Sequence, residues 1–220
     1  MNQTDPAPAS PHWHQSRAEE IANSISHGVG LAGALVGGPI LIATAWTRGD
    51  GPFLVGAVIY AMTIVLLYLG STLYHAWPQT PAKFVFQVID HSAIFLLIAG
   101  TYTPFTLGPL RGPWGWTILG VIWTLALLGV ALKVCGGVRR PKLSITLYLG
   151  MGWLILVAMR PLSLAVPTST LVWLVAGGVA YTAGVIFFVR DRIRYNHFVW
   201  HLFVLAGSGC HYCAVFSYAA

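Results

Sequence analysis

Seven separate stretches of mostly apolar residues constrain this chain more than any other feature of its sequence. They cover residues 25–46, 53–77, 84–107, 114–135, 142–160, 170–189 and 197–218. A helix needs about 20 apolar residues to cross the hydrocarbon core of a bilayer. Only 8% of the residues are charged, whereas a soluble domain carries about 25%. The sequence therefore predicts an all-α protein, a bundle of seven transmembrane helices.

Other classes of protein fit the composition poorly. A membrane β-barrel would alternate polar and apolar residues, which these stretches do not. Three cysteines in 220 residues are too few for a disulfide scaffold, and the net charge of +6 is spread over short loops, so nucleic acid binding is not predicted. Residues 1–18 are polar and rich in proline and are expected to form a disordered cytoplasmic tail, with residues 19–220 forming the membrane domain.

The lysines and arginines between the stretches predict the orientation. The side that holds the N-terminus carries nine of them and the opposite side carries three, Arg48, Arg111 and Arg160. Basic loops stay in the cytoplasm. We therefore expect a cytoplasmic N-terminus and an external C-terminus. Anionic lipid headgroups are expected near the basic residues Arg139, Arg140, Lys142, Arg190, Arg192 and Arg194.

Ionisable residues inside the apolar stretches are costly unless they are paired or face a cavity. In the predicted topology six of seven such residues lie at one depth near the cytoplasmic face. These six are His27, His75, Asp90, His91, His197 and His201. The seventh, His211, lies farther toward the outside, where we expect it to form a hydrogen bond in the same cavity.

The spacing of the histidines favours a metal site. His197 and His201 are four residues apart, so both imidazoles can reach one ion from the same helix face. His75 would supply a third nitrogen and leave a fourth position for water, which is typical of catalytic zinc. Two histidines spaced four apart on a helix, taken by themselves, are more often hydrogen-bonded core residues than metal ligands. The common depth of the three histidines and Asp90 favours metal.

Two further residues are candidates for catalysis. Asp90 is the only carboxylate in the same layer and could hold the water or accept its proton. Ser71 lies one helical turn before His75 and could bond to Asp90 or to a ligand. His91 is rotated by about 100° from Asp90 on the helix. Its side chain is therefore expected to pack against another helix or to contact one of the metal ligands from behind.

Polar residues on the first helix allow two interpretations. Glu20, Asn23 and His27 share one face. They could line the proposed site. Alternatively, Glu20 stabilises the helix N-terminus while Asn23 and His27 form interhelical hydrogen bonds.

Three segments together resemble the hemolysin III branch of the progestin and adipoQ receptor family. They are Ser-Thr-Leu-Tyr-His at 71–75, Asp90 followed by Gly-Thr-Tyr-Thr-Pro at 100–104, and His-Phe-Val-Trp-His at 197–201; residues 20–27 match the first-helix pattern of the family. The resemblance spans residues 18–218. It implies zinc bound by His75, His197 and His201, with Asp90 and Ser71 around the water. It also implies kinship with alkaline ceramidases and a role in membrane homeostasis.

The sequence thus predicts a multi-pass protein of the bacterial inner membrane that binds zinc and hydrolyses an amide or ester bond in a membrane lipid. Two alternatives stay open: a receptor or regulator of membrane composition with structural zinc, and a membrane-damaging haemolysin. Haem binding through His197 and His211, which are 14 residues apart, is disfavoured because no partner helix carries a matching pair.

Overall fold

Every regular element of the structure, a computed structural model that describes residues 15–136, 140–190 and 193–220, is helical. The elements are α1 (Arg17–Thr47), α2 (Gly51–Ala76), α3 (Pro81–Leu107), α4 (Pro113–Gly136), α5 (Pro141–Trp153), the 3-10 helix η1 (Leu154–Ala158), α6 (Met159–Ala165), α7 (Thr168–Phe188) and α8 (Asn196–Ala219). Because α5, η1 and α6 form one span, seven helical segments of this described chain are long and apolar enough to cross a membrane. The predicted seven-helix bundle is confirmed.

The helix starts follow from local sequence. Ser16 caps α1 in a reciprocal capping box with Glu19, and the Asp50 side chain accepts a hydrogen bond from the Phe53 N–H at the start of α2. Proline occupies the first turn of α2, α3 and α5, where its missing N–H costs nothing. Helix α1 begins at Arg17, slightly before the predicted start of the membrane domain. Residues 1–14 of the predicted tail lie outside the described residues.

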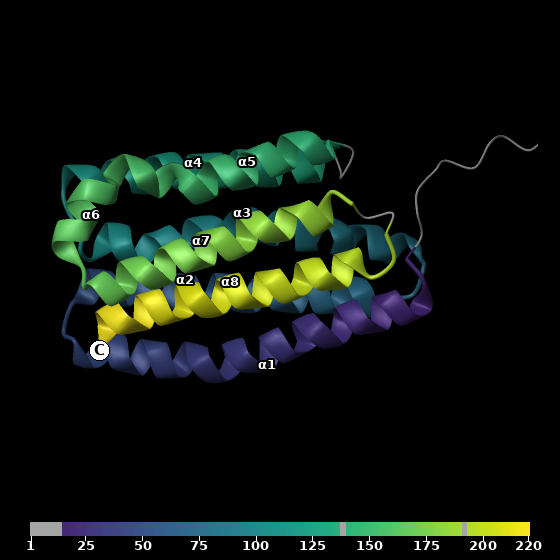
Figure 1. Ribbon diagram of the computed structural model, residues 1–220, viewed down its shortest axis with the longest axis horizontal. Coiled ribbons are helices and arrows are strands. Elements are labelled where there is room, and N and C mark those ends of the chain that lie inside the picture. Colours follow the sequence, from purple (N-terminus) through teal and green to yellow (C-terminus); the bar gives the residue numbers. More distant parts are fainter. Residues whose placement is uncertain (1–14, 137–139, 191–192) are drawn as a thin grey trace, which may run out of the picture.

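The helices lie side by side along the long axis of the molecule (Figure 1). Helix α2 packs between α1 and α3, and α8 packs between α7 and α1. The C-terminus lies at the end of the bundle opposite the start of α1, as an odd number of crossings requires. Which end faces the cytoplasm stays a prediction.

Close packing of α2 on α3 depends on a glycine. A Cβ at Gly56 would lie 2.5 Å from Cα of Pro104, a backbone atom that cannot move aside.

On the outside of the bundle, large apolar side chains such as Ile25, Val36 and Val157 are exposed. A soluble protein would bury many of these groups, whereas in a membrane they face lipid.

The fifth span is not the continuous helix that its sequence predicts. It changes to a 3-10 helix after Trp153 and becomes α-helical again at Met159. The Tyr102 hydroxyl of α3 occupies this irregular turn, where it donates to the Met151 carbonyl (2.7 Å) and accepts from the Ile155 N–H (2.9 Å). Backbone groups freed at membrane depth need such partners.

Candidate metal centre

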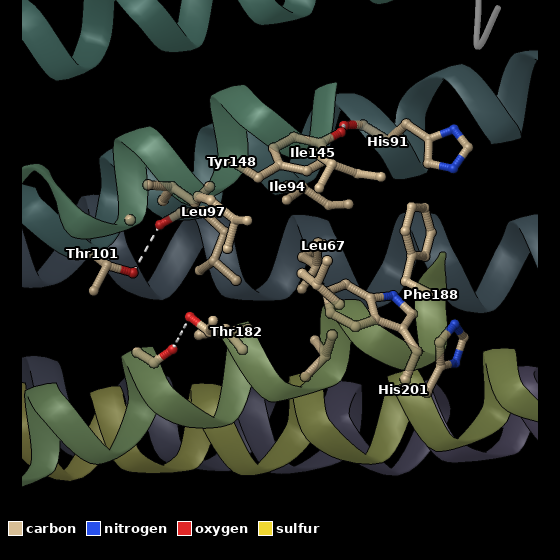
Figure 2. A pocket seen from close by; sticks show the side chains of 18 of the residues that line it. Leu67, His91, Ile94, Leu97, Thr101, Ile145, Tyr148, Thr182, Phe188 and His201 are labelled. Carbon is tan, nitrogen blue, oxygen red and sulfur yellow. Dashed lines mark hydrogen bonds between the residues drawn. The ribbon is translucent and has the colours of Figure 1, made fainter. Parts of the chain in front are cut away.

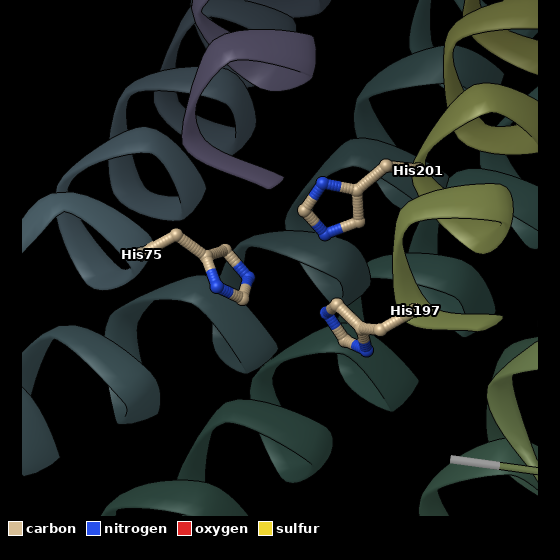
Figure 3. A group of neighbouring side chains, drawn as sticks. All are labelled: His75, His197 and His201. Carbon is tan, nitrogen blue, oxygen red and sulfur yellow. The ribbon is translucent and has the colours of Figure 1, made fainter. Parts of the chain in front are cut away.

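The helices bring together three histidines from two elements. His75 comes from the last turn of α2, and His197 and His201 come from the first turns of α8. One ring nitrogen of each lies within 4.8 Å of the others, and the rings converge on a common point (Figure 3). Nitrogen ligands of tetrahedral zinc are about 3.3 Å apart, so the rings would move inward around an ion.

The hydrogen bonds of the rings fit a metal site. Nε2 of His75 and Nε2 of His197 are buried and have no hydrogen-bond partner among the described residues. Nδ1 of His75 lies 2.7 Å from the carboxylate of Glu20, and Nδ1 of His201 lies 3.2 Å from the carbonyl oxygen of Asn23. Histidines that bind metal usually donate their second N–H to a carboxylate or a carbonyl in this way. The donor set therefore suits zinc or another nitrogen-preferring divalent ion.

The carbonyl of Asn23 also defines the tautomer of His201. A carbonyl oxygen only accepts, so Nδ1 of His201 carries the hydrogen and Nε2 keeps its lone pair. The Ser26 hydroxyl donates to the same carbonyl (2.8 Å) and lies 3.1 Å from Nδ1 of His201. Ser26 was not among the predicted site residues.

The predicted catalytic residues lie beside the cluster. Asp90 and Ser71 are buried and line the same cavity as His197 and His201. Asp90 is not part of the group of mutually close ligand atoms, so it lies next to the histidines without being one of the candidate ligands. Ser71 Oγ forms no hydrogen bond with any described residue, so of its two expected partners, Asp90 and a bound ligand, the structure shows no bond to Asp90.

The polar residues of α1 do lie at the cluster. Glu20 contacts His75 directly, and Asn23 approaches His201 through its carbonyl group. The His27 ring stacks on the His201 ring, with 3.6 Å between centroids and 10° between planes. Both ring nitrogens of His27 are buried without a partner in the described chain. Glu20, Asn23 and His27 thus lie beside the three histidines, and their role at the site stays a prediction.

The two other histidines occupy opposite parts of the cavity. His91 lines its wall near the cluster, and its carbonyl accepts a hydrogen bond from the Tyr148 hydroxyl (2.9 Å). His211 lies ten residues beyond His201 on α8, which corresponds to about 15 Å along the helix axis. Its Nε2 lies 3.3 Å from the Leu174 carbonyl, so His211 makes a hydrogen bond of the kind we expected.

The cavity is elongated and mostly apolar. It is bounded by α3 and α5 on one side and by α7 and α8 on the other, with His91 and His201 at one end and Thr101 toward the other (Figure 2). Its volume is about 110 Å³. By the same measure, a cavity that holds one water molecule has a volume of roughly 10–15 Å³. It can hold several waters or part of a slender apolar chain.

Sequence reasoning missed two charged residues near the site. Lys83 is one of the nine basic residues that predict the orientation, and its ammonium group lies 2.9 Å from Glu20 Oε1. Glu19 accepts a hydrogen bond from the Tyr195 N–H (2.8 Å), which ties α1 to the start of α8. Both contacts join helices far apart in sequence, so no local pattern reveals them.

The basic residues expected near lipid headgroups are only partly described. Arg140, Lys142, Arg190 and Arg194 are exposed. Arg139 and Arg192 lie outside the described residues. The four exposed side chains are free to meet solvent or headgroups, and their partner stays a prediction.

Seven helices of membrane-spanning length in the described chain and a cluster of three histidines define a multi-pass membrane protein with a candidate metal centre. The chain belongs to the haemolysin-III-related family, whose model matches residues 15–212, and the predicted resemblance is confirmed. It is 45% identical over 200 residues to "Hemolysin-3" of Bacillus cereus, covering 91% of each chain.

Two further relatives extend the comparison. The chain is 42% identical to "Hemolysin-3 homolog" of Bacillus subtilis (strain 168), covering 91% of this chain and 94% of the relative. It is 29% identical to the human "Monocyte to macrophage differentiation factor", covering 96% and 89% of the two chains. No solved structure gives a significant match.

Proposed function

We propose that this protein is a zinc-dependent hydrolase that cleaves an amide or ester bond in a membrane lipid and thereby adjusts the lipid composition of the cell membrane. One observation carries the proposal. Three imidazoles converge, two of them, His197 and His201, line an apolar cavity, and buried ring nitrogens of His75 and His197 have no partner in the described chain. Asp90 and Ser71 line the same cavity.

The donor set supports zinc. Three histidines leave a coordination position open, as in catalytic zinc sites. A zinc ion bound there supplies positive charge that polarises a carbonyl and makes water acidic enough to lose a proton near neutral pH.

The residues of the chain supply the proton transfers. Asp90 accepts the proton of the attacking water as the new C–O bond forms at the lipid carbonyl. It then returns that proton to the leaving nitrogen or oxygen as the amide or ester bond breaks. Ser71, whose hydroxyl has no partner in the described chain, donates a hydrogen bond to an oxygen of the substrate in this proposal.

The shape of the cavity supports a lipid as substrate. An acyl chain can lie along its apolar wall, which includes Leu67, Ile94 and Leu97. The scissile carbonyl would then lie at the histidine end. The exposed basic residues Arg140 and Lys142 lie at the predicted cytoplasmic end, where an anionic surface attracts each Lys or Arg by about 1 kcal/mol.

Hydrolysis by the purified protein tests this proposal. Zinc-loaded protein in detergent is incubated with ceramide-like amides and with phospholipids, and released fatty acid is measured. We expect release by the native protein and a reduction of about 100-fold or more in Asp90→Asn, a loss typical of a missing general base. The variant should keep its zinc, because Asp90 is outside the ligand group.

Two outcomes would favour the alternatives. Zinc binding without release of fatty acid from any of these lipids would support a regulator with structural zinc. Lysis of red cells by the purified protein, unchanged in Asp90→Asn, would support a membrane-damaging role. Native and Asp90→Asn proteins that release fatty acid equally would contradict the role of Asp90.

A further inference from the structure

The carboxylate of Glu20 connects three helices behind the histidine cluster. Its Oε2 lies 2.7 Å from Nδ1 of His75 on α2, and its Oε1 lies 2.9 Å from Nζ of Lys83 on α3. The side chains are little exposed, at 0% for His75, 9% for Lys83 and 15% for Glu20. Each oxygen of the Glu20 carboxylate therefore has its own protein partner, in a part of the molecule that water reaches poorly.

The bond to Glu20 determines which nitrogen of His75 is available. An ionised carboxylate only accepts hydrogen bonds, so Nδ1 of His75 carries the hydrogen and donates it. Nε2 is left with its lone pair, and Nε2 is the His75 atom that is buried without a partner in the described part of the chain. Glu20 itself is outside the group of mutually close ligand atoms. It holds the ring from behind and is not a ligand.

Lys83 holds Glu20 in turn. Its ammonium group also donates to the Trp77 carbonyl (3.2 Å) and lies 5.0 Å from the centre of the Tyr74 ring. Trp77 is the C-cap of α2, two residues after His75, and Lys83 lies in the first turn of α3. Three contacts fix the ammonium group at this turn, so it keeps the Glu20 carboxylate in one orientation.

We propose that Glu20 is a positioning residue that sets the metal affinity of the histidine cluster by fixing the tautomer and the ring orientation of His75, and that Lys83 acts through Glu20. This inference rests on metal binding by the proposed centre. Removing a partner of this kind from a metal-bound histidine costs about 10- to 100-fold in affinity.

A competition titration with a zinc chelator measures the effect on the full-length protein in detergent. We expect Glu20→Ala to weaken zinc binding by about 10- to 100-fold. Glu20→Gln retains an oxygen that accepts from Nδ1, so it should restore part of that loss, and Lys83→Met should cause a smaller loss than Glu20→Ala. The control is Asp50→Asn, which removes the charge of an acidic residue that bonds to Arg111 at the opposite end of α2 and should leave zinc affinity unchanged.

A second measurement separates positioning from general stability. The visible absorption spectrum of the Co2+-loaded protein reports ligand geometry, and it should change in Glu20→Ala but not in Asp50→Asn. If Glu20→Ala does not fold, Glu20→Gln and Lys83→Met carry the test. Folding is checked by circular dichroism of the metal-free forms.

The outcomes distinguish this inference from the proposed function. If the native protein binds zinc and the folded Glu20 and Lys83 variants bind it with native affinity, the inference is overturned while the metal centre stands. If the native protein does not bind zinc, the metal centre and the inference both fail.

Discussion

Two of the three clustered histidines are held through the ring nitrogen that faces away from the cluster. Glu20 holds His75, and the Asn23 carbonyl holds His201. Spacing and depth in the sequence predicted which histidines would meet. They did not predict these partners, because each contact comes from α1 and depends on how that helix packs against α2 and α8.

His27 offers a residue-scale prediction. Its two buried ring nitrogens have no partner in the described chain, yet its ring stacks on His201. Replacing His27 by phenylalanine preserves the stacking and removes the unpaired ring nitrogens. Burial of such unpaired polar atoms lowers the free energy of unfolding by about 1–3 kcal/mol. We expect His27→Phe to keep one zinc per chain and to unfold at the same or a higher temperature in detergent. A clearly lower unfolding temperature would show that His27 has a polar partner.

The irregular fifth span can be tested through Tyr102. Tyr102→Phe removes the hydroxyl that bridges Met151 and Ile155 and leaves buried backbone groups unpaired. We expect it to lose about 1–3 kcal/mol of stability, seen as a lower unfolding temperature. Tyr212→Phe is the control, since it removes one bond to the Gly37 carbonyl on an ordinary helix. Equal effects of the two variants would contradict a special role for Tyr102.

The contact of α2 with α3 makes another prediction about the helices. Gly56→Ala places a methyl group 2.5 Å from Pro104 Cα, and such overpacking costs about 1–3 kcal/mol. Gly33→Ala is the matched control, because nothing lies within 4 Å of its added Cβ. Thermal unfolding should therefore shift downward for Gly56→Ala only. A Gly56→Ala protein as stable as Gly33→Ala would show that α2 and α3 can separate without cost.

Among the helices, the sequence predicted the membrane spans but not their local irregularities or the contacts between them. Apolar length alone identified all seven spans, because a membrane helix satisfies its own backbone. The 3-10 segment at Leu154–Ala158 was not predicted, because it is stabilised by the Tyr102 hydroxyl on another helix. The ion pair between Glu20 and Lys83 was missed for the same reason.

For the whole molecule, the charge distribution predicts that the histidine end of the bundle faces the cytoplasm. Reporter fusions at the C-terminus test this orientation. Alkaline phosphatase, which is active only outside the cytoplasm, should be active there, and a green fluorescent protein fusion should be dark after export. The reverse pattern would place the metal centre near the outer face of the membrane.

His75, His197 and His201 are expected to bind one metal ion together. Elemental analysis of the detergent-purified protein tests this expectation most directly, beside a His197→Ala, His201→Ala double variant whose folding is verified by circular dichroism. We expect about one zinc per chain in the native protein and none in the folded variant, because two of the three ligands are gone. Native protein that stays free of metal after zinc is supplied would contradict it.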